Sequence, residues 1–167
     1  MKKFFILLTF FFVKFSFGQH EFSLNVEGAI PVGDFAKAFK FGYGSGVKYG
    51  YQVNNLSSAV TVSVNFFALK TKDLGIGTNE YAAYQTIVPM KVGYRHMFNN
   101  FWIEPQLGYT YLHTFQNANG WAPTYAAGLG YREGRLDLGI RYEGNVLSGK
   151  ATSFVGVSIG YLFTGWR

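Results

Sequence analysis

Few residues of this 167-residue chain could do chemistry, and its three histidines come first. A hydrolase needs a nucleophile, a general base and a group that orients the base, all within hydrogen-bond reach. His20 follows an apolar N-terminal segment, and His96 shares the alternating register of the aromatic residues Tyr94 and Phe98, which predicts a packing role. His113 remains as a candidate base, but no serine accompanies it in YLHTFQNANGW. We therefore predict no catalytic site, and the spacing of His, Asp and Glu predicts no metal or cofactor site.

The composition is unusual for a soluble domain. Charged residues make up 14% of the chain and aromatic residues 20%, whereas soluble domains carry about 25% charged residues. The net charge of +6 includes Lys2, Lys3 and Lys14, and without these three the chain has 12 basic and 9 acidic residues. No run of Lys and Arg remains after Lys14, so nucleic-acid binding has little support.

The first 18 residues have the parts of a secretory signal peptide. Two lysines precede an apolar run over residues 4–13, and the small residues Ser16 and Gly18 follow. The run is shorter than the roughly 20 residues that a membrane-spanning helix needs. We expect cleavage after Gly18, which leaves residues 19–167 as one domain. The chain has no cysteine, so we expect no lipoprotein anchor and no disulfide framework.

After this segment, the chain alternates between apolar and small or polar residues, which predicts β-strands. The stretch FVGVSIGYLF at 154–163 shows the pattern, with Val157 and Ile159 on one face and Gly156, Ser158 and Gly160 on the other. The predicted strands cover about 20–31, 42–53, 56–68, 84–97, 101–113, 122–132, 135–145 and 152–163. They are joined by tight turns at Asn54-Asn55, Asn99-Asn100 and Glu133-Gly134 and by long connections at 32–41, 69–83, 114–121 and 146–151.

The tight turns predict which residues face each other, because paired residues in a hairpin share a face of the sheet. The predicted pairs are Arg95 with Glu104, Lys48 with Thr61, and Gly130 with Asp137. In all three hairpins, apolar positions then face apolar positions and polar positions face polar ones.

Charged residues within the predicted strands all lie on the face opposite the aliphatic side chains. They are Glu21, Glu27, Lys48, Lys91, Arg95, Glu104, Arg132, Arg135, Asp137, Arg141 and Glu143. Aromatic residues border the aliphatic face at both ends: Phe22, Tyr51, Phe98, Phe101, Tyr131 and Phe163 near one rim, and Tyr43, Phe66, Tyr84, Tyr111 and Tyr125 near the other. Two aromatic belts around an aliphatic band are typical of a protein that crosses two membrane interfaces.

An open sheet cannot lie in hydrocarbon, because its unpaired edge groups would each cost several kcal/mol. We therefore predict an all-β, eight-stranded, antiparallel up-and-down transmembrane β-barrel. The alternative is a soluble β-sandwich or lipocalin-like barrel with the apolar face inward. Such a protein would need a charged outer face, which the face of Gly156, Ser158 and Gly160 does not supply.

Eight strands enclose a space that side chains just fill. The predicted lumen holds four acids and four bases: Glu27, Glu104, Asp137 and Glu143 with Lys48, Lys91, Arg95 and Arg141. We expect Arg95 to pair with Glu104 and Asp137 to lie near Arg135 and Arg141, while the first hairpin allows Glu27 to meet Lys48. The expected result is a lumen plugged by an ion-pair network. The alternative is that these charges only contact lumen water, where each contributes little.

The stretches AIPVGDF (29–35), GVKYGY (46–51) and VGVSIGYLF (155–163) resemble the small OmpA/OmpX-like outer-membrane β-barrel domains. The resemblance implies a location in the outer membrane of a Gram-negative-type bacterium, with the short turns on the periplasmic side. It also implies that Tyr161 and Phe163 form the C-terminal signal that the barrel-insertion machinery reads. Some small barrels modify lipid A, but the His-x-Ser pattern of the deacylases is missing at His113.

The expected function is non-enzymatic: a structural or surface-interaction role, either membrane stabilisation or adhesion through the four long connections. The expected partners are outer-membrane lipids, the insertion machinery and an extracellular ligand of the loops, and a monomer is the simplest expectation. We expect DFAKAFKF (34–41) to form a short capped helical turn whose Phe35 and Phe39 cover the barrel mouth. The first alternative is a small pore or a hydrophobic-ligand transporter, and the second is a lipid-A-modifying enzyme.

Overall fold

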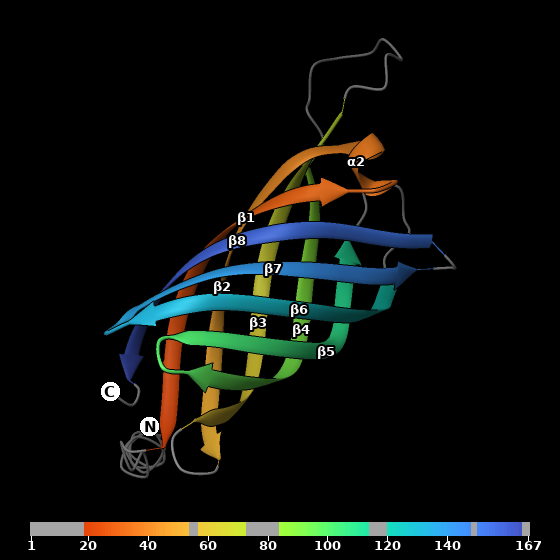
Figure 1. Cartoon of the computed structure of the whole chain (residues 1–167). Coiled ribbons are helices and arrows are strands. Elements are labelled where there is room, and N and C mark those ends of the chain that lie inside the picture. Colours follow the sequence, from red (N-terminus) through yellow and green to blue (C-terminus); the bar gives the residue numbers. More distant parts are fainter. Residues whose placement is uncertain (1–18, 54–56, 73–83, 114–119, 148–149, 165–167) are drawn as a thin grey trace, which may run out of the picture.

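The structure, a computed structural model, is a closed β-barrel in which every strand is antiparallel to its neighbours and β1 pairs with β8 (Figure 1). It describes residues 19–53, 57–72, 84–113, 120–147 and 150–164. The predicted signal peptide, residues 1–18, lies outside this part of the chain. The elements are β1 (His20–Val32), α2 (Phe35–Ala38), β2 (Phe39–Val53), β3 (Ser58–Thr71), β4 (Tyr84–Phe98), β5 (Phe101–His113), β6 (Gly120–Glu133), β7 (Leu136–Leu147) and β8 (Lys150–Thr164). The predicted fold and all eight strands are confirmed.

The two ends of the barrel differ (Figure 1). β1 begins and β8 ends at one end, here called the inner end, where the tight β4–β5 and β6–β7 turns also lie. The helix α2 lies at the opposite, outer end. No helix among the described residues has the length and the apolar character needed to cross a bilayer.

The β4–β5 turn has the predicted register, and the β6–β7 turn does not. Phe98 pairs with Phe101 across Asn99-Asn100. On β6 and β7, Glu133 pairs with Leu136, so the turn residues are Gly134-Arg135 and not Glu133-Gly134. In both turns the first central residue has positive φ, 56° at Asn99 and 57° at Gly134. Because this conformation favours glycine or asparagine, the first central position falls on Gly134.

The β2–β3 register is also shifted by two residues from the prediction. Lys48 pairs with Ser63 and not with Thr61, and the last pair is Val53 with Ser58. A shift of two leaves every side chain on its predicted face, because side chains alternate with a period of two along a strand. The assignment of faces is therefore correct where the partners are wrong.

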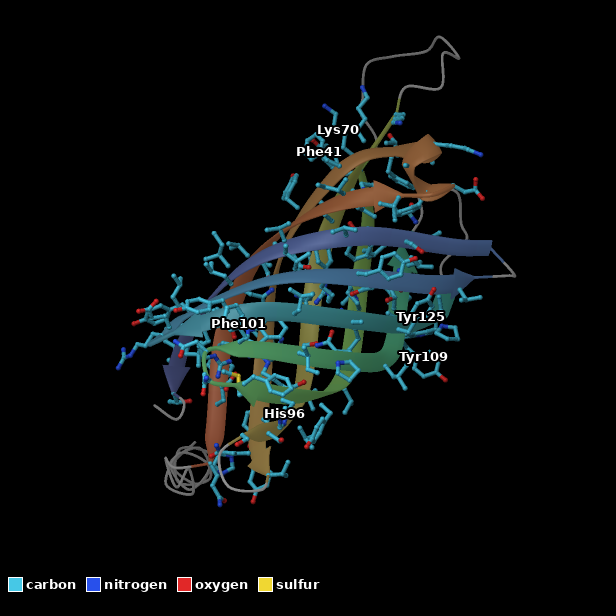
Figure 2. All side chains as sticks on the ribbon, in the orientation of Figure 1. Phe41, Lys70, His96, Phe101, Tyr109 and Tyr125 are labelled. Atoms are coloured by element: carbon cyan, nitrogen blue, oxygen red, sulfur yellow. The ribbon has the colours of Figure 1, made fainter. Side chains whose placement is uncertain are left out.

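The two faces of the sheet have the predicted orientation. Val157 and Ile159 are 49% and 54% exposed on the barrel exterior, whereas Arg95 and Glu104 are 1% and 2% exposed inside. Aromatic side chains ring the exterior at both ends, and Figure 2 shows Phe101 nearer the inner end of the β5–β6 pair and Tyr125 nearer the outer end. The exterior is thus an apolar band between two aromatic belts, which is the surface that a bilayer requires.

The glycines of the inward face make room for large side chains on the neighbouring strand. A Cβ atom added at Gly44 would lie 2.5 Å from the ring of Phe67, and one at Gly42 would lie 2.4 Å from Leu69. This packing explains why glycines recur among the inward positions of the alternating pattern. The narrow lumen accepts a large side chain from one strand only where its neighbour contributes none.

Candidate functional site in the barrel lumen

The inner half of the lumen contains an ion-pair layer centred on Arg95. Its Nε lies 2.8 Å from Glu104 Oε2, and its Nη1 lies 2.7 Å from Asp137 Oδ2. Arg132 reaches the same group from β6, with Nη1 2.7 Å from Glu21 Oε2 and Nη2 2.7 Å from Asp137 Oδ2. These five side chains come from β1, β4, β5, β6 and β7, so the layer ties together strands on opposite walls of the barrel.

Glu104 is the most heavily hydrogen-bonded carboxylate of this layer. Besides Arg95, it accepts hydrogen bonds from Lys48 Nζ at 2.9 Å, Thr61 Oγ1 at 2.6 Å and Gln106 Nε2 at 2.7 Å. A buried ionised carboxylate is tolerated only when paired and hydrogen-bonded, and both oxygens of Glu104 meet this condition.

Trp102 packs beside the same layer. Its Nε1 donates to Asp137 Oδ1 at 2.8 Å, and the guanidinium carbon of Arg95 lies 4.2 Å from the centre of its ring. The ring covers the inward faces of Gly130 and Gly139, where an added Cβ would lie 2.4 Å and 2.9 Å from it. The tryptophan thus supplies apolar volume, a hydrogen bond and a cation–π contact.

A second, smaller ion-pair layer lies further along the lumen. Arg141 Nη2 lies 2.9 Å from Glu27 Oε1 and 3.1 Å from Glu143 Oε2, and Lys91 Nζ forms an ion pair with Glu143. This layer has two acids and two bases. The inner layer has three of each: Glu21, Glu104 and Asp137 with Lys48, Arg95 and Arg132. Each layer is therefore neutral by itself.

The structure corrects several predicted contacts. Asp137 contacts Arg95 and Arg132, not Arg135 or Arg141, and Glu27 forms its ion pair with Arg141, not with Lys48. Glu21 and Arg132 lie on the predicted inward face, and they belong to the inner ion-pair layer although the predicted network does not include them.

Arg135 is the one strand charge assigned to the wrong environment. It occupies the β6–β7 turn, where it is exposed and its Nη1 lies 3.1 Å from the Tyr161 hydroxyl. The error follows from the turn register, because a turn placed one residue earlier made Arg135 a strand residue.

Toward the outer end, the lumen is lined first by polar side chains and then by apolar ones. Thr110, Thr124 and Asn145 form a hydrogen-bonded trio, with Thr110 Oγ1 2.7 Å from Asn145 Oδ1. Beyond the trio lies a buried apolar cluster, here called the apolar seal, made of Ala29, Phe35, Phe39, Phe67, Leu69, Ile87, Leu112, Ala122 and Phe154.

The helix α2 contributes to the apolar seal as expected. The rings of Phe35 and Phe39 lie 4.5 Å apart, and both are buried at the barrel mouth. The predicted cap is wrong: Asp34 makes no capping hydrogen bond and instead forms an ion pair of 2.8 Å with Lys37. This exposed contact, chiefly its hydrogen bond, holds the pKa of Asp34 below its usual value.

A cavity of about 40 Å³ lies in the lumen, and both ion-pair layers contribute to its lining. Asn65 and Gln106 line it, and each has a buried amide oxygen without a protein partner. Such a space holds at most a few water molecules, which suit these orphan oxygens.

The histidines do not form a catalytic group in the described structure. His96 Nδ1 lies 2.8 Å from Ser58 Oγ at the inner rim, a contact that the sequence did not indicate. No described carboxylate contacts His96, and its ring packs at 4.5 Å against Phe98. His113 ends β5, and its side chain lies outside the described part. The described residues also contain no cluster of three His, Cys, Asp or Glu side chains that suits a metal ion.

No family model matches the chain, and no curated protein sequence matches it. Several solved structures do match the chain. The Yersinia pestis outer membrane protein Ail in a phospholipid nanodisc matches with a TM-score of 0.60 and 18% identity, covering 87% of this chain and 100% of Ail. A crystal structure of Ail with the heparin analogue sucrose octasulfate matches equally, covering 99% of Ail. The N-terminal β-barrel domain of Pseudomonas aeruginosa OprF matches with a TM-score of 0.57 and 15% identity, covering 87% of this chain and 99% of the domain.

At these identities the likeness concerns the fold. The location follows from the exterior, since a closed barrel with an exposed apolar band and two aromatic belts is stable only in a bilayer. The chain is thus an integral protein of the outer membrane, and it has the fold of the small eight-stranded outer-membrane β-barrels.

Proposed function

We propose that the chain is a non-enzymatic outer-membrane barrel that stabilises the membrane and presents surface loops, and that its lumen is closed to ions. The observation that carries this proposal is the filling of the lumen. Two neutral ion-pair layers and the apolar seal leave a central cavity of about 40 Å³. The two kinds of barrier differ physically: the ion pairs resist rearrangement through desolvation, and the apolar seal excludes water.

The surface role is supported by the contrast between the barrel wall and its outer connections. The wall is a closed hydrogen-bonded sheet, which fixes the positions of the strand ends that the outer connections join. Binding residues commonly lie on loops held by a rigid scaffold. The similar Ail structure holds a heparin analogue, and an extracellular ligand for the connections at 32–41, 69–83, 114–121 and 146–151 is part of our proposal.

Planar-bilayer recording tests the closed lumen. We expect the folded wild-type protein to show no reproducible open state, because both barriers cross the path. The rival function is a small pore or a hydrophobic-ligand transporter. A reproducible wild-type opening whose conductance rises in Arg95→Ala or Glu104→Ala would favour the pore and contradict our proposal.

The enzymatic alternative has its own measurement. We expect lipid A from cells that make the wild-type protein to have the same mass profile as lipid A from cells that make His113→Ala. A modified lipid A species that depends on His113 would show that the barrel is an enzyme.

Tyr161 and Phe163 are our proposed insertion signal. Both lie on the lipid-facing side of β8 near the inner end of the barrel. Comparing the rate of outer-membrane assembly of Phe163→Ala with that of the wild type tests this role, and an unchanged rate would exclude it.

A further inference from the structure

The hydrogen-bonded ladder between β3 and β4, which are neighbours in the barrel wall (Figure 1), is interrupted in its middle. Pairing is absent at two successive positions, Asn65 opposite Pro89 and Phe66 opposite Val88, and the register is the same on both sides of the break. Proline has no N–H group to donate. The main-chain carbonyl group of Asn65 therefore lacks the ladder donor that another residue at position 89 would supply.

A second interruption, between β4 and β5, is spanned by side chains. Pairing is absent for Tyr94 opposite Pro105 and for Arg95 opposite Glu104. The side chains of Arg95 and Glu104 bridge this break, because Nε and Nη2 of the arginine lie 2.8 Å and 2.7 Å from the same carboxylate oxygen. A buried ion pair thus joins β4 and β5 where the backbone does not.

The β3–β4 break has no such bridge between the residues that face each other. Pro89 has no polar side-chain atom, and Asn65 Oδ1 is buried without a hydrogen-bond partner. Ser63 Oγ, two residues away on the same inward face of β3, is also buried and unpartnered. Phe66 and Val88 face the lipid and are apolar. Unsatisfied polar atoms therefore gather on the inner side of this seam.

The other two prolines of the chain lie where a ladder has already ended. Pro31 keeps its pairing with β8 and lies beyond Ala29, the last residue of β1 that pairs with β2. Pro123 keeps its pairing with β5 and precedes Thr124, the first residue of β6 that pairs with β7. The remaining irregularities of the described sheet are register shifts near strand ends. Among the described strands, an unbridged break in mid-ladder is thus particular to the β3–β4 seam.

The lumen cavity lies on the inner side of this break. Asn65 lines the cavity of about 40 Å³, which has room for water. A water molecule has two donors, and Asn65 presents two acceptors without a donor, its side-chain oxygen and its main-chain carbonyl oxygen. An unsatisfied backbone group at membrane depth costs several kcal/mol, so hydration from the lumen stabilises this position.

We propose that the β3–β4 seam at Asn65 and Pro89 is a hydrated opening point of the barrel wall, where lumen water binds Asn65 and the two strands separate locally. A hydrogen-bonded antiparallel pair normally exchanges two bonds, and proline leaves at most one here. Local opening is easiest where the fewest bonds break. The inference concerns the wall and is independent of whether the lumen conducts ions.

Hydrogen–deuterium exchange of the folded protein in phospholipid nanodiscs, followed residue by residue with NMR, tests this proposal. We expect the N–H of Asn65 to exchange at least about tenfold faster than the amides of residues 138–142 in β7, whose ladders to both neighbours are continuous. In Pro89→Ala the restored N–H donates to the Asn65 carbonyl, and exchange at Asn65 becomes about fivefold slower, the effect of one ordinary hydrogen bond. The substitution leaves the sequence neighbours of Asn65 unchanged, so its intrinsic exchange rate is the same.

Pro105→Ala is the matched control, because it restores an N–H group at the bridged interruption and leaves exchange at Asn65 unchanged. We also expect a cross-peak between water and the side-chain amide protons of Asn65. The mobility shift between unboiled and boiled samples verifies that each variant is folded.

Four results would overturn the proposal. They are exchange at Asn65 as slow as in β7, exchange unaltered by Pro89→Ala, exchange slowed equally by Pro105→Ala, and the absence of the water cross-peak. Exchange at Tyr94 as fast as at Asn65 would overturn the assignment of the opening to the unbridged seam. An open lumen in bilayer recordings contradicts the proposed function and leaves these exchange rates as expected.

Discussion

Replacing Glu104 with alanine is expected to lower the free energy of unfolding by about 3–5 kcal/mol. The substitution removes an acceptor that Arg95, Lys48, Thr61 and Gln106 share, and it leaves a buried guanidinium short of one partner. Breaking one side of a buried pair is costly because the remaining charge stays desolvated. Urea unfolding of the barrel in lipid vesicles, followed by the gel mobility of unboiled samples, measures the change.

Glu133→Gln is the matched control for this experiment. Glu133 is exposed at the inner turn and accepts a hydrogen bond of 3.1 Å from the Tyr131 hydroxyl, so its loss is expected to change stability by less than about 1 kcal/mol. If Glu104→Ala keeps both wild-type stability and wild-type conductance, the lumen charges only contact water and the proposed network is wrong.

Trp102→Ala is expected to destabilise the barrel by about 3–5 kcal/mol, the range for large-to-small changes of buried aromatic residues. The change empties the space above Gly130 and Gly139 and removes the hydrogen bond to Asp137 and the contact with Arg95. The same vesicle unfolding experiment measures this loss. Because narrow barrels have little freedom to collapse inward, we expect the cavity to persist.

Trp121→Ala provides a comparison with the same side-chain change on the opposite face. Trp121 is 56% exposed in the outer aromatic belt, so its removal leaves no internal cavity and should cost clearly less than the loss of Trp102. Equal losses for the two variants would mean that Trp102 contributes no more than a lipid-facing aromatic residue. In that case the lumen packing would not be a main source of stability.

These two variants probe the same half of the lumen by different physics. Glu104 contributes by satisfying buried charge, and Trp102 contributes by filling volume. Their effects are expected to be non-additive, because Arg95 contacts both Glu104 and the ring of Trp102, and Asp137 binds both Arg95 and Trp102.

The strand count, the barrel and the identity of the inward face were predictable from the sequence. They depend on local alternation, and a register error of two residues leaves alternation unchanged, as β2–β3 and β6–β7 show. The burial of Glu104 and the exposure of Val157 followed from this period alone.

The partners inside the lumen were predictable only where a tight turn joined them. Arg95 and Glu104 lie on adjacent strands across Asn99-Asn100, and that register was correct. Arg132 and Glu21 are 111 positions apart in the chain, and their contact exists only because the closed barrel brings β1 and β6 toward a common centre. No local pattern contains this information.

On the barrel surface, Lys70 is likewise a residue whose position the sequence left open and the strand pairing determined. Its residue type suited either a loop or a strand end, and the sequence analysis placed it in a loop. Only the pairing with Phe41 and Tyr84 placed its cation within the outer aromatic belt. The sequence by itself determined which side chains face lipid and which face inward, because that choice repeats every second residue. The tertiary structure decided which inward charges meet, because closure and register set the distances between strands that are remote in the chain.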